Sequence, residues 1–176
     1  GAGWTLANVL GAEGADPNFF QVTANEGGGI TPNLGAPTSC GVANNGNNTL
    51  HVTSVFFPGG GAAYDAGGLC GFWFCPQTNR RAQSPVINCT GQSSIILSFD
   101  YIEGGQGSTD NATLWYFNGT TWSQIDDMPK TATGCGGQGL WVTRTVSLPA
   151  SANNNPNVRI GFRWVNNDDG VGTDPS

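Results

Sequence analysis

Three acidic, glycine-rich stretches carry most of the side chains that could do chemistry. They are "YDAGG" with Asp65, "DYIEGGQGSTDN" with Asp100, Glu103 and Asp110, and "NNDDGVGTD" with Asp168, Asp169 and Asp174. Calcium takes several oxygen ligands from carboxylates, amides and backbone carbonyls, and glycine-rich turns let carbonyls point inward. We therefore expect a calcium site, with Asp110, Asp168 and Asp169 as its preferred ligands and Asp65, Asp100 and Glu103 as second choices. The alternative is that these residues only cap turns.

Catalytic arrangements have weak support in this sequence. A Ser-His-Asp site would need His51, the single histidine, but it lies inside an alternating pattern with no nucleophile motif nearby. We interpret His51 as a solvated strand residue. A glycosidase needs two carboxylates that face each other across a cleft. Asp100 and Glu103 share one expected strand end, and Asp126 and Asp127 fall in an expected loop, so we expect no enzymatic activity.

The five cysteines point to an oxidising compartment. They are Cys40, Cys70, Cys75, Cys89 and Cys135, and none forms a C-x-x-C pair that would favour zinc. Two disulfides and one leftover thiol are the better interpretation. Cys70 and Cys75 bracket a short loop that a disulfide could close, and Cys89 and Cys135 could pair with each other. The connectivity stays open.

The tryptophans raise the question of sugar binding, because exposed aromatic rings stack on sugars. Trp73 lies between Cys70 and Cys75 and is the tryptophan that we expect to be exposed, as a platform for a glycan. Four others, Trp115, Trp122, Trp141 and Trp164, fall at strand positions where alternation is expected to bury them.

Length and charge limit the partners. The 176 residues suit one domain, 1–176, and the net charge of −6 argues against nucleic acid, which needs a basic face. No apolar run is long enough to span a bilayer, so we expect no membrane insertion. Only 10% of the residues are charged, and such a surface suits an extracellular protein.

Short alternating stretches separated by glycine and proline predict the elements. The expected strands are Thr49–Phe57, Ser93–Gly105, Gly139–Pro149 and Asn157–Asn167, with an edge strand within 3–14, a short strand at 82–88 and a hairpin at 111–125 around Asn118–Gly119. Residues 18–49 and 58–81 are expected to be mainly loop. We predict an all-β fold, an antiparallel two-sheet β-sandwich of jelly-roll type with long glycine-rich loops.

The order of these motifs resembles that of a known family. Ser84–Pro85 starts a strand, an L-x-F-x-Y strand follows at 97–101, Asp110 precedes the next strand, "NGTTW" makes a hairpin at 118–122, and an I-x-F-x-W strand lies at 160–164. In this order and spacing, residues 64–176 resemble the MAM- and cleaved-adhesin-like jelly-roll modules found in type IX secretion cargo of gliding and biofilm-forming bacteria.

The resemblance implies a two-sheet sandwich, frequent calcium, and non-catalytic roles in adhesion, sugar binding or surface architecture. In the family a strand of the type "F-A-I-D-D-I" normally follows the acidic turn, and no such strand follows Asn166–Ser176 here. We therefore expect a domain that lacks its terminal strand, with another molecule able to supply one. Subunits that lend strands head to tail form a fibre.

We thus expect a non-catalytic adhesion or structural module, extracellular or at the cell surface. Its expected partners are other copies or domains of the same protein, bound by strand addition. The alternative is a carbohydrate-binding module of a secreted hydrolase that binds glycans through Trp73.

Overall fold

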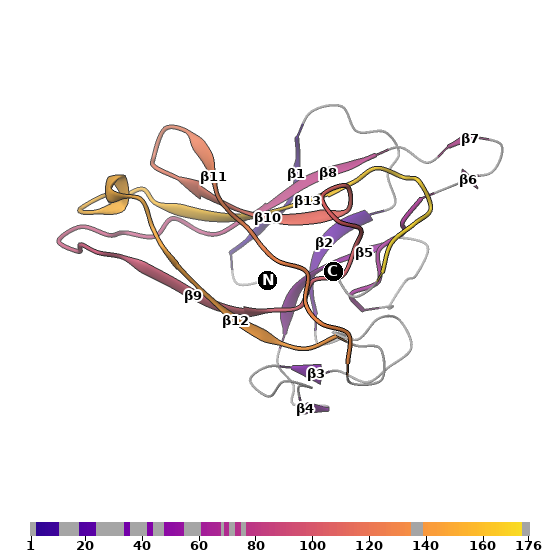
Figure 1. Cartoon of the computed structure of the whole chain (residues 1–176). Coiled ribbons are helices and arrows are strands. Elements are labelled where there is room, and N and C mark those ends of the chain that lie inside the picture. The colour runs from indigo at the N-terminus through magenta and orange to yellow at the C-terminus, as the bar shows by residue number, and fades with distance from the viewer. Residues whose placement is uncertain are drawn as a thin grey trace.

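In the computed structural model of the chain, β-strands are the main secondary structure (Figure 1). It describes residues 3–10, 18–23, 34–35, 42–43, 48–54, 61–67, 69–70, 73–74, 77–134 and 139–173. Within these ranges every paired strand is antiparallel, and the helical structure is one 3-10 turn at Ala150–Ala152. The described part of the chain has no helix long and apolar enough to cross a membrane. The predicted all-β antiparallel class is confirmed.

Five strands form the main sheet, in the order β1-β8-β13-β10-β11. Their bounds are β1 Thr5–Val9, β8 Thr78–Gln83, β13 Arg159–Asn166, β10 Asn111–Phe117 and β11 Trp122–Asp127. The predicted edge strand near the N-terminus is confirmed as β1. The predicted hairpin is also confirmed, and the side chain of Asn118 caps its loop by accepting the N–H groups of Thr120 and Thr121.

Four two-stranded sheets accompany the main sheet. They are β2 (Asn18–Thr23) with β5 (Thr49–Ser54), β9 (Ile96–Tyr101) with β12 (Val142–Ser147), β3 (Leu34–Gly35) with β4 (Val42–Ala43), and β6 (Leu69–Cys70) with β7 (Trp73–Phe74). The strands predicted from alternation correspond to β5, β9, β12 and β13.

Two expected loops contain strands that pack in the fold. β8 lies beside the central β13, although its sequence, TNRRAQ, is polar and shows little alternation. Pairing with β1 on one side and β13 on the other supplies its hydrogen bonds, and Ala82 is its fully buried apolar side chain. β2 was likewise expected as loop, yet Phe20 is buried opposite Val52 of β5. Of the predicted strand at 82–88, Ala82 and Gln83 form the end of β8, and Ile87 forms an isolated bridge with Val158.

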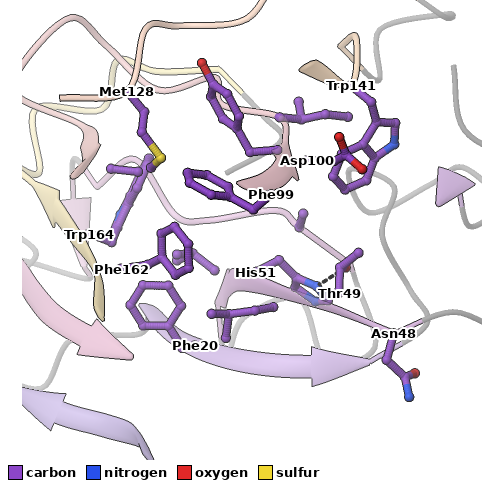
Figure 2. Close-up of a pocket in the computed structure, with 16 residues that line it drawn as sticks. Phe20, Asn48, Thr49, His51, Phe99, Asp100, Met128, Trp141, Phe162 and Trp164 are labelled. Atoms are coloured by element: carbon purple, nitrogen blue, oxygen red, sulfur yellow. Dashed lines mark hydrogen bonds between the residues drawn. The ribbon is translucent and has the colours of Figure 1, made fainter. Parts of the chain in front are cut away.

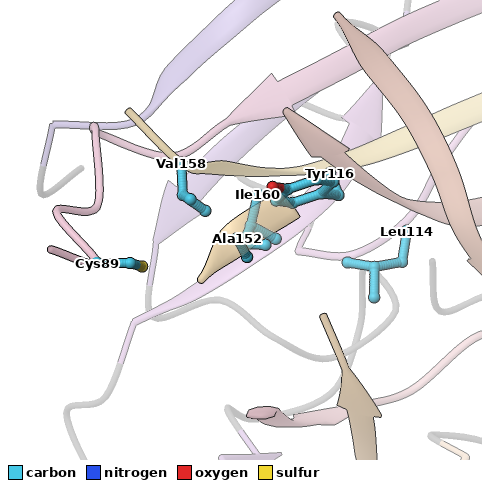
Figure 3. Close-up of a cluster of buried hydrophobic side chains, with 6 residues drawn as sticks. All are labelled: Cys89, Leu114, Tyr116, Ala152, Val158 and Ile160. Atoms are coloured by element: carbon cyan, nitrogen blue, oxygen red, sulfur yellow. The ribbon is translucent and has the colours of Figure 1, made fainter. Parts of the chain in front are cut away.

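The core consists of two clusters on the inner face of the main sheet. The first contains Cys89, Leu114, Tyr116, Ala152, Val158 and Ile160 (Figure 3). Side chains of β9 and β12 pack against it. The second contains Phe20, Val52, Tyr64, Ala82 and Trp164, and it lies against β2 and β5. Phe162 packs against both clusters.

The second layer of the fold is therefore divided. Where the sequence predicts one continuous sheet opposite the main sheet, the described strands give two separate pairs, β2-β5 and β9-β12. Each pair covers its own cluster, and no described strand connects the two pairs.

Candidate functional site: a cleft between two strand edges

A cleft of about 310 Å³ lies between the two covering pairs (Figure 2). Its floor comes from the main sheet, through Ala112, Phe162 and Trp164. One wall is the run 49–52 of β5, and the opposite wall is the run 99–102 at the end of β9. Consecutive residues of a strand line a cavity when the strand presents its edge, because a strand face would contribute only alternate residues.

Backbone hydrogen bonds show which groups of β5 point away from β2. The Ser54 N–H donates to the carbonyl of Ala63, which lies outside β2, so this N–H points away from the β2 partner strand. Backbone groups of alternate residues point to the same edge of a strand. The N–H and C=O groups of Leu50 and Val52 therefore point away from β2, and both residues line the cleft.

The same reasoning applies to β9. The Leu148 N–H donates to the Ile95 carbonyl at 2.9 Å, so the odd-numbered residues of β9 direct their backbone groups toward β12. The even-numbered residues of β9, including Asp100, direct theirs to the opposite edge, and Ile102, just after β9, also lines the cleft. Two strand edges thus face one cavity.

The cleft is lined mainly by aromatic and aliphatic side chains. The rings of Phe99 and Phe162 meet edge-on with centroids 5.1 Å apart, and Trp141 and Met128 lie on the same side as Phe99 (Figure 2). The polar side chains at the cleft include Asp100, which is exposed and accepts a hydrogen bond from the hydroxyl of Thr143. An apolar groove between strand edges can accept an extended peptide.

His51 lies on β5 and is buried, so our interpretation of it as a solvated residue is wrong. Its Nε2 contacts the Gln21 amide at 2.9 Å and the Thr23 hydroxyl at 3.5 Å, and its Nδ1 contacts the Thr49 hydroxyl at 3.1 Å. Burial lowers the pKa of His51 to about 4, which keeps the imidazole neutral near pH 7. These partners are amide and hydroxyl groups, so they do not resemble the carboxylate that orients a catalytic histidine.

The structure brings Asp110 and the loop after β13 together. Asp110 is fully buried, and its Oδ2 accepts a hydrogen bond of 2.7 Å from the Tyr64 hydroxyl. Its Oδ1 accepts the Asn167 N–H at 3.1 Å. Burial raises the pKa of the Asp110 carboxyl, although these hydrogen bonds oppose the rise. Asp110 thereby ties Tyr64 to the end of β13.

Three other predicted calcium ligands lie in or beside this loop. Asp168 is buried at a positive φ of 61°, and Asp169 is exposed and accepts hydrogen bonds from Asn167 and Val171. Asp65 accepts the Gly67 N–H, and Gly67 forms a backbone bridge with Asp169. Asp65, Asp110, Asp168 and Asp169 thus lie in neighbouring loops, whereas their role as metal ligands stays a prediction.

Glu103 is buried nearby and is held by Lys130. Its Oε1 accepts hydrogen bonds from Lys130 Nζ at 2.5 Å and from the Ala112 N–H at 2.8 Å. The same Lys130 ammonium donates to the Asp110 carbonyl at 2.7 Å, which connects the two acidic residues. Burial raises the pKa of Glu103, and Lys130 opposes this effect. Asp100 is separate from these contacts, on the exposed side of β9.

In the observed geometry these carboxylates have a structural role. Asp110, Asp169 and Glu103 accept hydrogen bonds from the chain's own hydroxyl, amide and ammonium groups. Among the residues that the structure describes, no group of three or more His, Cys, Asp or Glu side chains is arranged to hold a metal ion. The calcium site stays a prediction, with no positive support from this arrangement.

The remaining predicted residues are only partly placed. Cys89 is buried with a free thiol, and its expected partner Cys135 lies outside the described residues, as does Cys75. Cys70 and Trp73 lie in β6 and β7, but their side chains are also outside the described part, so the disulfides and the Trp73 platform stay predictions. Sequence reasoning missed the cleft, because no local pattern shows which strand edges face each other.

We expect Gly67→Ala to destabilise the acidic loop strongly. Gly67 has a φ of +94°, and an added Cβ would lie 2.3 Å from the Asp168 Cα. Urea unfolding should show a loss of more than about 2 kcal/mol. Gly91→Ala is the matched control, because Gly91 has a φ of +74° with open space around it, and its loss should be about 1 kcal/mol. Equal losses in both variants would contradict the close packing of Gly67 on Asp168.

His51 should make the protein less stable in acid. Its folded pKa of about 4 lies below the ordinary 6.5, so the unfolded chain takes up the proton first as the pH falls. The stabilisation that comes from keeping His51 neutral is complete above pH 6.5. The free energy of unfolding then decreases by about 3 kcal/mol as the pH falls to 4. Urea midpoints from pH 7 to 4 should fall less steeply in His51→Gln than in the wild type.

The raised pKa values of Glu103 and Asp110 give a pH dependence of opposite sign. Glu103 and Asp110 are present in both proteins. The difference between the pH profiles of wild type and His51→Gln therefore reports the titration of His51. Parallel pH profiles would mean that His51 does not titrate as its burial requires.

No family model, curated protein or solved structure gives a significant match to this chain. The functional assignment therefore depends on the residues and geometry described above.

Proposed function

We propose that this chain is a non-catalytic extracellular module of an adhesive or structural assembly, in which a strand from a second copy inserts between β5 and β9. The observation that supports it is the cleft with a strand edge on either side and an apolar floor. Open strand edges carry unpaired N–H and C=O groups, which an added strand satisfies.

The inserted strand would also complete the fold. It would hydrogen-bond to Leu50 and Val52 on one side and to Asp100 and Ile102 on the other. The pairs β2-β5 and β9-β12 would then become one continuous sheet opposite the main sheet, as in a jelly roll. Alternate side chains of the strand would pack on Phe162 and Trp164, which line the floor.

Insertion between copies gives a head-to-tail contact, because the donor segment and the acceptor cleft are different parts of the molecule. Such contacts extend into filaments unless the rotation between subunits closes a ring. An adhesive or surface layer is an assembly of this kind. The low content of charged residues, 10%, agrees with an extracellular surface.

Leu50→Pro should abolish this assembly. Proline lacks the N–H that Leu50 directs away from β2, and this N–H does not belong to the β2-β5 hydrogen bonds. Leu50→Ala is the matched control, because it also removes the leucine side chain but keeps the N–H. Light scattering after size-exclusion chromatography, over a range of concentrations, should show association of the wild type and of Leu50→Ala, and a monomer for Leu50→Pro.

Equal association of the two variants would contradict strand insertion at β5, and a wild type that stays monomeric at all concentrations would contradict the assembly. Circular dichroism of each variant establishes that it is folded.

Calcium binding is part of the proposal and has a separate test. Asp110, Asp168 and Asp169 lie around one loop, and a cation bound to the native state alone raises the melting temperature. Calorimetry in millimolar calcium should show a rise of several degrees relative to chelator. Asp168→Asn should lose this rise, and asparagine tolerates the positive φ at this position. No shift in the wild type would leave these carboxylates as hydrogen-bond acceptors of the loop.

A further inference from the structure

The outer face of the main sheet carries an aromatic and cationic cluster that neither the core nor the cleft uses. Arg81 of β8 lies directly opposite Arg163 of β13, and Gly161 of β13 lies opposite Trp115 of β10. Side chains alternate between the two faces of a strand. Since Phe162 and Trp164 face the core, Arg163 and its neighbours on this side face outward.

Two tryptophan rings hold the two guanidinium groups in place. The Arg81 guanidinium carbon lies 3.9 Å from the ring centroid of Trp122 and 5.6 Å from that of Trp115. Arg163 lies 5.4 Å from the Trp115 centroid. Gly161 makes this packing possible, because a Cβ there would lie 2.8 Å from Arg81 Cδ and 2.9 Å from Trp122 Cζ3.

The expectation that strand alternation buries Trp115 and Trp122 in the core is wrong. Both are half-buried on the outer face, whereas Trp164 is 1% exposed in the core. A guanidinium that lies over an aromatic ring keeps its N–H groups in its own plane, available to an acceptor.

The described part of the chain supplies no carboxylate to these arginines. The ion pairs Lys130–Glu103 and Arg144–Asp126 involve other residues. Arg81 is only 6% exposed, and its Nε has no hydrogen-bond partner there. Arg163 donates from Nε to the neutral Asn79 amide at 2.8 Å.

Among the described strands, the acidic residue of this face is Asp127 of β11. Asp127 pairs with Thr113 of β10, and Thr113 in turn pairs with Arg163 of β13, so Asp127 lies two strands away from Arg163. Asp127 accepts a hydrogen bond from Asn111. Two adjacent cations without a counter-charge repel each other, and a bound anion would relieve this repulsion. The site therefore favours a negatively charged ligand, although the whole chain carries a charge of −6.

We propose that this outer face binds a carboxylated polysaccharide, with Arg163 contacting a sugar carboxylate, the buried Arg81 adding positive charge beside it, and the edges of Trp115 and Trp122 contacting the sugar rings. Arginine binds carboxylates through paired N–H groups. Neutral hydrogen-bonding side chains surround the arginines, namely Asn79, Gln83, Thr113 and Gln124. Amides and hydroxyls match sugar hydroxyls, which favours an acidic glycan over an acidic peptide.

This site differs from the Trp73 platform that the sequence suggested, and it lies on the opposite face of the main sheet from the cleft. The glycan proposal therefore stands independently of strand insertion. The Leu50→Pro variant should bind the glycan as the wild type does.

Titration calorimetry with polygalacturonate tests the proposal. We expect binding that weakens with salt, and no binding to fully methyl-esterified polygalacturonate, which has the same sugar without the charge. Arg163→Gln should reduce affinity about tenfold or more. Arg163→Lys should restore it only in part, because lysine keeps the charge but lacks the paired donors.

Arg80→Gln is the control, since it removes the same charge from the neighbouring strand β8, on the opposite face of the sheet. It should leave the affinity unchanged, and equal losses in Arg80→Gln and Arg163→Gln would overturn the assignment of the site. Polyglutamate that binds as tightly as polygalacturonate would also overturn it, in favour of an acidic protein. Absence of binding to polygalacturonate in a folded wild type would refute it.

Discussion

The packing of Phe162 is the contact on which the two halves of this core depend. Its ring lies 5.1 Å from that of Phe99 on β9 and 6.0 Å from that of Trp4 beside β1. It packs against both hydrophobic clusters, and it also forms part of the cleft floor. Because β13 is the middle strand of the main sheet, its inward side chains reach both covering pairs, whereas those of an edge strand would reach only one.

The alternation of β13 gives the sheet two different faces. Ile160, Phe162 and Trp164 bury apolar surface on the inner side, and burial of this kind is the main favourable term in folding. Gly161 and Arg163 lie on the outer side, where the tryptophans of β10 and β11 surround the guanidinium groups. One face thus stabilises the domain, while the other carries Arg81 and Arg163, which belong to the proposed glycan site.

The acidic residues connect loops that would otherwise have few contacts. Asp110 joins Tyr64 to Asn167, and Glu103 joins the segment after β9 to Lys130. Removing one partner of a buried charged pair is costly, because the other charge stays buried without compensation. These contacts hold the loops at the end of β13 and thereby fix one side of the fold, while the gap between β5 and β9 stays open among the described strands.

The sequence by itself determined the strands whose side chains alternate strongly. β9, β13 and the β10-β11 hairpin follow from local periodicity and from Asn118–Gly119, because the direction of a side chain along a strand is a local property. The sequence also placed Asp110 and Asp168 next to strand ends, but their use as calcium ligands stays a prediction. It did not reveal β8, whose polar residues become a strand only when β1 and β13 pair with both of its edges.

Only the tertiary structure decided which groups share a surface. The burial of His51 requires β2 beside β5, and the position of Arg81 against Trp122 requires β8 and β13 to be neighbours. The cleft likewise depends on the edges of β5 and β9, which lie about fifty residues apart in the chain. No local sequence pattern encodes that two such distant edges will lie side by side. Such contacts depend on long-range strand pairing, because hydrogen bonds between backbone groups are the same for every residue type except proline and carry little sequence information.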